Sequence, residues 1–264
     1  MGNVNLARVT VGGLETSICE AGTGQAIMMI HGATYNHRLW IKQIRAVSSV
    51  GEVYALDLPG HGASSRFPAD RIISIKSYAD HVHEVLRALG RSSTVLIGHS
   101  MGGAISIMYA MDHPSEVESL ILVGTGAKLG VSPAIFQALS SNYENGITSA
   151  MAQLSFSDKT DKRIIEEGAG EMLKCPQDIA LADFRACNEF DARASISEIR
   201  VPTLVIVGEE DKLTPVKWSE FLHNNIGNSR IRIIKAAGHM VMVEKPSELN
   251  ACIISFLRKS SNGV

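Results

Sequence analysis

The stretch Gly98-His99-Ser100-Met101-Gly102-Gly103 decides the fold of this chain. An apolar, β-branched run at 94–97 precedes it and a mostly apolar, helix-compatible run at 104–111 follows it. We therefore predict a tight turn from a buried strand into a helix. Ser100 would sit there in a strained backbone conformation that lifts it clear of the sheet. A side chain at Gly98 or Gly102 would collide with the neighbouring strand or helix, so the stretch is suited to present a nucleophilic serine.

Apolar runs separated by helical patterns extend from this turn in both directions. Strands are expected at 26–30, 52–56, 119–123, 203–207 and 230–234, with an N-terminal hairpin of 3–11 and 15–20 joined by Gly12-Gly13. Helices are expected near 39–47, 77–89 and 246–257. Continuous apolar strands that alternate with helices indicate a parallel sheet covered on both faces. The predicted fold is α/β, with a mostly parallel eight-stranded sheet.

This alternation stops between Gly126 and Arg200. Four helical segments are expected there, at 133–140, 147–154, 162–173 and 176–188. The strand pattern then resumes, which is typical of an inserted helical cap above the sheet. We therefore expect a core in two parts, 1–125 and 201–264, and a helical cap at 126–200.

Composition, net charge and cysteine spacing exclude several classes of protein. The chain has 264 residues, 45% of them hydrophobic, which is enough for a sizeable core. A net charge of −2 lacks the basic footprint of a nucleic-acid-binding protein. No run of 18 apolar residues and no signal-peptide pattern is found, so no membrane partner is expected. The four cysteines have no metal-ligand spacing and are expected as free thiols of a cytoplasmic protein.

A serine hydroxyl is a poor nucleophile unless a base, usually a histidine oriented by a carboxylate, takes its proton. Functional groups of parallel sheets gather at the carboxyl ends of the strands. Asp211 follows the apolar run 203–207, and His239 follows 230–234, in suitable places and in the chain order Ser, Asp, His. Glu209 and Glu210 lie beside Asp211 and are alternative orienting carboxylates.

The charge that forms on an attacked carbonyl oxygen needs hydrogen-bond donors already in place. The N–H of Met101, at the start of the expected helix, is one such donor. The other should come from the loop after the strand 26–30, where Gly32 lets the backbone approach the substrate and Ala33 follows. The expected oxyanion hole is the pair of N–H groups of Ala33 and Met101.

The other histidines are expected to be structural. His61 belongs to a turn with Asp57, while His81 and His83 lie two positions apart on a helix and cannot face the same way. No pair has a metal-site spacing with a third ligand, so no metal is expected. The loop 124–130 contains three glycines but opens no βαβ unit, so no nicotinamide cofactor is expected either.

The chain resembles the α/β-hydrolase superfamily, in particular its capped serine carboxylesterases and the related C–C bond hydrolases and enol-lactonases. The matching motifs span nearly the whole chain outside 126–200: His31-Gly32, Asp57-Leu58-Pro59-Gly60-His61-Gly62, Gly98 to Gly103, Val201-Pro202-Thr203 through Asp211, and Gly238-His239. The resemblance implies a triad of Ser100, Asp211 and His239 and favours Asp211 over its glutamate neighbours. It does not choose the reaction, because this superfamily hosts many chemistries on one scaffold.

A serine at the nucleophile position argues against the superfamily's haloalkane dehalogenases and epoxide hydrolases, which use a carboxylate. We expect hydrolysis of a carboxylic ester of a small or medium, largely apolar substrate, by a monomer or homodimer without a cofactor. The alternatives are a C–C bond hydrolase or enol-lactonase of aromatic catabolism, a cofactor-free perhydrolase or hydroxynitrile lyase and, outside enzymes, a small-molecule sensor. C–C bond hydrolases often carry a tryptophan soon after the catalytic histidine, whereas here Met240-Val241-Met242 follows His239. The expected pocket-lining residues are Trp40, Phe136, Leu139, Met151, Leu154, Phe156, Phe190, Leu213 and Met240.

Overall fold

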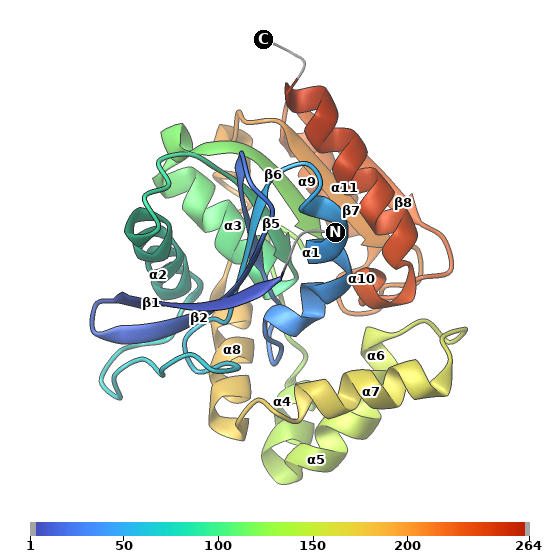
Figure 1. Ribbon diagram of the computed structural model, residues 1–264. Coiled ribbons are helices and arrows are strands. Elements are labelled where there is room, and N and C mark those ends of the chain that lie inside the picture. The colour runs from blue at the N-terminus through green and yellow to red at the C-terminus, as the bar shows by residue number, and fades with distance from the viewer. Residues whose placement is uncertain (1–3, 262–264) are drawn as a thin grey trace.

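The computed structural model describes residues 4–261 and contains one eight-stranded sheet (Figure 1). The strand order is β1-β2-β4-β3-β5-β6-β7-β8, and all pairs are parallel except β1–β2 and β2–β4. The strands are β1 (Asn5–Val11), β2 (Leu14–Ala21), β3 (Ala26–Ile30), β4 (Glu52–Leu56), β5 (Thr94–His99), β6 (Val117–Val123), β7 (Thr203–Gly208) and β8 (Ser229–Ile234). The predicted mostly parallel sheet is thereby confirmed; Asn3, the expected first hairpin residue, lies outside the described residues.

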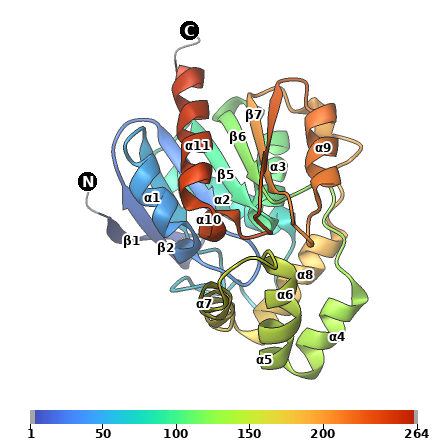
Figure 2. The same ribbon diagram turned by 90° about the vertical axis from the view of Figure 1, so that its right-hand side faces the viewer.

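Helices cover the sheet on both faces (Figure 2). One face carries α1 (Ile41–Val47), which follows the short helix η1 (His37–Trp40), and α11 (Pro246–Ser261), which follows α10 (Val241–Glu244). The other face carries α2 (Ile75–Ala88), α3 (Met101–Asp112) and α9 (Val216–Asn225). The two layers account for the all-apolar central strands, since successive side chains of a strand point to opposite faces.

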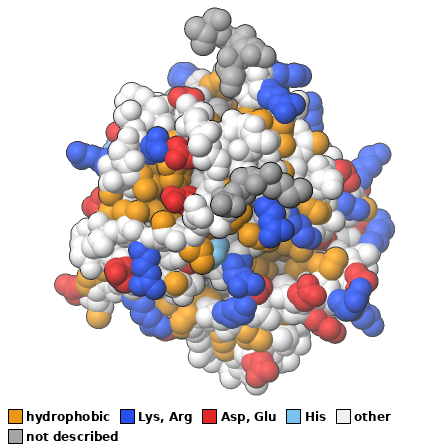
Figure 3. Space-filling view, viewed as in Figure 1, with side chains coloured by type: hydrophobic (Ala, Val, Ile, Leu, Met, Phe, Trp, Pro, Cys, Tyr) orange, Lys and Arg blue, Asp and Glu red, His pale blue; other side chains and the backbone are white. Residues whose placement is uncertain are grey.

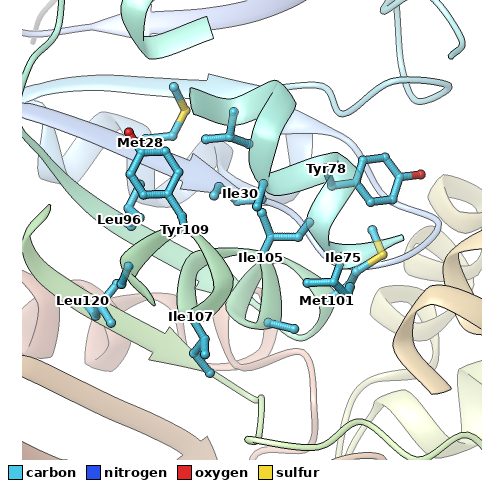
Figure 4. Close-up of a cluster of buried hydrophobic side chains, with 14 of the residues drawn as sticks. Met28, Ile30, Ile75, Tyr78, Leu96, Met101, Ile105, Ile107, Tyr109 and Leu120 are labelled. Atoms are coloured by element: carbon cyan, nitrogen blue, oxygen red, sulfur yellow. The ribbon is translucent and has the colours of Figure 1, made fainter. Parts of the chain in front are cut away.

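Strand β3 shows this division of the core. Met28 and Ile30 pack toward α2 and α3, whereas Ile27 and Met29 pack toward α1 and α11. Figure 4 shows the first of these layers, with Met28, Ile30 and Leu96 of the sheet near Ile105 and Tyr109 of α3. Helix α3 therefore packs on both the sheet and α2, and it begins where β5 ends.

A helical segment, residues 126–200, connects β6 to β7. It contains α4 (Pro133–Ser141), α5 (Tyr143–Asn145), the π-helix η3 (Gly146–Met151), α6 (Ala152–Ser155), α7 (Lys162–Met172), α8 (Gln177–Glu189) and η4 (Ile196–Glu198). Most of these helices lie below the sheet in Figure 1, on the side where the parallel strands end. The expected helix at 147–154 is a π-helix that continues into α6. No helix within residues 4–261 combines the length and apolar character needed to cross a bilayer.

Candidate active site

Ser100 occupies the turn between β5 and α3. Its φ of 53° and ψ of −115° lie outside the regions that side chains favour, as the sequence predicts for this position. A Cβ at Gly98 would come within 2.2 Å of the Gly102 carbonyl oxygen, so the turn closes only with glycine there. The Ser100 N–H donates to Val123 O at 2.9 Å, and Thr125 Oγ1 donates to Ser100 O at 2.8 Å. These bonds hold the strained residue on the neighbouring strand.

Asp211 and His239 meet beyond the carboxyl ends of β7 and β8. His239 Nδ1 lies 2.8 Å from Asp211 Oδ2, and both residues are buried. The carboxylate also accepts hydrogen bonds from the backbone N–H groups of Leu213 and Thr214 and from Thr214 Oγ1, at 2.8–2.9 Å. Because Nδ1 donates to this carboxylate, the neutral ring presents Nε2 as a proton acceptor.

The two glutamates beside Asp211 turn away from the imidazole. Glu210 bonds to Ser157 Oγ at 2.5 Å and to Lys159 Nζ at 2.6 Å, and Glu209 Oε2 lies 3.5 Å from the Ala236 N–H. Of the three acidic residues that the sequence offers, the structure therefore brings Asp211 to His239.

A buried neutral imidazole supports the backbone of His239. His99 Nε2 donates to His239 O at 3.1 Å, and the two ring centroids lie 4.6 Å apart. Burial, followed by the nearby His239, keeps the pKa of His99 well below its ordinary value. His99 thus adds no charge beside His239. The His239 N–H in turn donates to Ser155 O at 2.9 Å and ties this loop to the helical segment.

Ser100 and His239 line the same small cavity. Its volume is about 30 Å³, room for about one or two water molecules. Met151, Leu213 and Met240 of the predicted pocket line it. Gly32, expected to bring the backbone close to the substrate, also lines it. Sequence reasoning missed the other lining residues, which are Thr34, Tyr35, His99, Ser155, Met172 and Phe184. Met172 and Phe184 lie on α7 and α8, so the wall opposite Ser100 comes from the helical segment.

The other six predicted pocket residues do not line this cavity. Trp40 is fully buried against His99, with ring centroids 6.4 Å apart. Leu139 and Phe156 lie in the same apolar cluster, where Phe136 and Leu154 are partly buried, and Phe190 packs into the cluster on the α2 and α3 face. The large apolar side chains of segment 126–200 mainly join it to the core, and the sequence pattern does not distinguish that use from a pocket wall.

A larger cleft of about 840 Å³ lies between η1, α1 and α7. Apolar side chains such as Leu39, Ile164 and Met242 line it, with Arg38 and Lys42 among its charged residues. On the molecular face shown in Figure 3, hydrophobic, basic and acidic side chains are interspersed in small groups. Tyr35, which is 7% exposed, lines both this cleft and the cavity at Ser100.

The loop after β3 places Ala33 on the wall of the Ser100 cavity. Thr34 beside it has a φ of 67°, and its N–H donates to Asp183 Oδ2 at 3.1 Å. His31 Nδ1 donates to Gly32 O at 2.8 Å. The Met101 N–H begins α3, where helical N–H groups have no partner within the helix. Both residues expected to supply oxyanion donors thus lie beside Ser100. Met101 is the next residue in the chain, and Ala33 lies on the wall of the same cavity.

Asp183 is a buried carboxylate on α8 of the helical segment, and its hydrogen bond with the Thr34 N–H fixes the loop after β3. Besides the Thr34 N–H it accepts bonds from His61 Nε2 at 2.9 Å and Tyr78 Oη at 2.8 Å. His61 Nδ1 faces Pro59 O at 3.2 Å, so both ring nitrogens donate and the imidazole is protonated. Burial opposes that charge, but Asp183 outweighs it and raises the pKa of His61 well above its ordinary value.

Comparisons with known proteins agree with this fold. A family model described as alpha/beta hydrolase fold matches residues 25–163, which is more than half of the chain. The chain belongs to the α/β-hydrolase-fold family. A second model, described as TAP-like protein, matches residues 183–262.

Individual members of the family differ in their reactions. A solved thermophilic esterase is 33% identical, with a TM-score of 0.86 over 98% of this chain and 99% of that one. Monoacylglycerol lipase ABHD6 of Bos taurus is 24% identical over 89% of this chain and 76% of its own length. The 2-hydroxy-6-oxo-2,4-heptadienoate hydrolase of Pseudomonas putida is 27% identical over 92% of this chain and 93% of its own. The protein is therefore a hydrolase of the α/β fold with esterases, lipases and C–C bond hydrolases among its relatives.

Proposed function

We propose that this hydrolase cleaves a carboxylic ester of a small or medium, largely apolar substrate through an acyl-enzyme on Ser100. The observation that carries the proposal is the pairing of His239 with buried Asp211 beside the cavity that Ser100 lines. This is the arrangement that turns a serine hydroxyl into a nucleophile for an activated carbonyl. The 33% identical thermophilic esterase supports the choice of an ester.

The reaction consists of two half-reactions, acylation of Ser100 and hydrolysis of the acyl-enzyme. Ser100 Oγ attacks the ester carbon while His239 Nε2 takes the hydroxyl proton, and Asp211 stabilises the imidazolium that forms. The N–H groups of Ala33 and Met101 bind the oxyanion, which collapses as His239 returns the proton to the departing alcohol. Water then attacks the acyl-enzyme by the same route, and the carboxylic acid leaves with Ser100 restored.

The helical segment acts as a cap that sets substrate size. A cavity of about 30 Å³ is too small for an ester, so the site must open for substrate to enter. Tyr35 lines both this cavity and the cleft of about 840 Å³, whose apolar wall suits an acyl chain or aromatic group. We propose that one end of the substrate passes Tyr35 and lies in this cleft.

The second candidate is hydrolysis of a C–C bond in a vinylogous diketone, with enol-lactones as a related substrate class. The observation in its favour is the Pseudomonas putida relative, which is as similar in sequence as the lipases and covers 92% of this chain. C–C hydrolases often carry a tryptophan soon after the catalytic histidine, whereas here Met240-Val241-Met242 follows His239 and Met240 lines the cavity. That departure ranks this reaction below ester hydrolysis.

A panel of p-nitrophenyl esters from acetate to decanoate tests the proposal, with Ser100→Ala as the matched variant. We expect many turnovers per chain in the wild type and none above background in the variant. Activity on vinylogous diketones alone would replace the proposal with the second candidate. A single turnover followed by silence would instead indicate a sensor, and equal activity in both proteins would exclude Ser100 as the nucleophile.

A further inference from the structure

A second cluster of reactive side chains lies where α2 meets the C-terminal end of α3. His83 comes from α2, His113 directly follows α3, and Glu116 ends the short helix η2 (Pro114–Glu116). One ligand atom from each of the three lies within 4.8 Å of the other two, and all three side chains are half-buried. The cluster has no part in the chemistry at Ser100, because that residue lies at the opposite end of α3, about 18 Å away along a 12-residue helix.

One pair in this cluster already has the spacing of two ligands on a shared ion. His83 Nε2 and Glu116 Oε2 lie 3.3 Å apart, yet they form no hydrogen bond. Two ligands about 2.1 Å from a tetrahedral ion are separated by about 3.4 Å, with the nitrogen lone pair aimed at the ion between them. His83 Nε2 is buried and makes no hydrogen bond with any described residue, although Glu116 Oε2 lies opposite it.

The surroundings keep the cluster ready to bind a cation. Tyr109 Oη donates to Glu116 Oε2 at 2.8 Å, as the partners of metal-binding carboxylates do. Tyr109 itself is anchored in the core layer seen in Figure 4. The carboxylate is therefore oriented by a hydrogen bond from a buried side chain.

The two imidazoles complete the donor set. Their rings stack with centroids 3.8 Å apart and planes 22° apart. His113 directly follows α3, and one of its ring nitrogens lies within 4.8 Å of the ligand atoms of His83 and Glu116. Two imidazoles and one carboxylate are ligands for zinc and similar first-row ions, with water in the remaining position.

We propose that His83, His113 and Glu116 bind one divalent first-row ion, for which Zn²⁺ is the probe, and that the ion ties α2 to the end of α3. The sequence shows no sign of this site, because His83 stands thirty positions before His113 and only the packing of α2 on α3 unites them. The ion would stabilise the layer behind Ser100 without entering the reaction.

Calorimetric titration of the untagged, EDTA-treated protein with zinc chloride tests the proposal. We expect one ion per chain, and a melting temperature about 5 °C higher when zinc is at a hundredfold excess over its dissociation constant. His113→Ala and Glu116→Gln should each abolish both effects. The matched control is His223→Ala, a half-buried histidine on α9 that bonds to Ser229, and it should bind zinc like the wild type.

Two outcomes overturn this site. One is the absence of binding heat and of any shift in melting temperature. The other is zinc binding that survives His113→Ala and disappears in Cys175→Ser, which would place the ion at the buried group of His61, Cys175 and Asp183. Ester turnover is expected to be unchanged by zinc at the proposed site and by His113→Ala.

Discussion

Replacement of Asp183 by alanine should both destabilise the fold and slow the reaction. The variant leaves His61 as a buried cation without its partner and removes the acceptor of the Tyr78 hydroxyl and the Thr34 N–H. Breaking a buried ion pair on one side typically costs about 3–5 kcal/mol. Thr34 lies next to Ala33, so we also expect kcat to fall about tenfold or more while KM changes less.

Urea unfolding followed by circular dichroism measures the first effect, and Asp178→Ala is the matched control. Asp178 lies on the same helix but pairs with Arg66 in solvent, where such a bond contributes at most about 1 kcal/mol. The double variant Asp183→Ala with His61→Leu should lose less unfolding free energy than the sum of the two single variants, because it also removes the buried unpaired charge of His61. If Asp183→Ala were no less stable than Asp178→Ala, the inference that the buried contacts of Asp183 stabilise the fold would be refuted.

Three further outcomes follow from the same geometry. Asp211→Asn should lower kcat on p-nitrophenyl butyrate about 10⁴-fold, since the amide no longer fixes the His239 tautomer; a loss under tenfold would contradict the assigned role. Tyr35→Ala should raise kcat/KM for decanoate relative to acetate by joining the cavity to the cleft, and an unchanged ratio would exclude that route. Burial lowers the pKa of His31 to about 3 and that of His81 to about 4. Between pH 6.5 and 4 the unfolded chain therefore binds more protons than the folded one, and the free energy of unfolding decreases as the pH is lowered. His81→Gln should lessen that slope in urea titrations by up to about 1.4 kcal/mol per pH unit, and an identical slope would contradict the inference.

The central part of the fold could be predicted because the signals there are local. The apolar run of β3 and the glycines around Ser100 each admit one conformation, and the structure has both as expected. Helix α9 was not predicted, because its apolar residues form no clear stripe and its start at Pro215 is not marked by a side-chain cap. Helix η3 was expected as an ordinary α-helix, since the sequence does not reveal the wider π turn.

The site residues that belong to local sequence motifs could be predicted, whereas those that depend on contacts between distant segments could not. Asp211 and His239 follow strand ends, and the sheet brings them together. His61 was expected to be structural in its turn, but its partner Asp183 is 122 positions away and becomes visible only when α8 packs on the core. The pocket wall depends on side-chain packing between the helical segment and the sheet, which explains why Phe184 was missed and Phe190 was expected at the pocket instead.

Covalent labelling of the nucleophile tests the central claim most directly. The protein is treated with a small fluorophosphonate, which reacts with serines activated by a neighbouring base, and the adduct is located by peptide mass spectrometry. We predict one adduct per chain, on Ser100, formed quickly in the wild type and far more slowly in His239→Ala. An adduct on another residue, or equal labelling rates in the two proteins, would contradict the account.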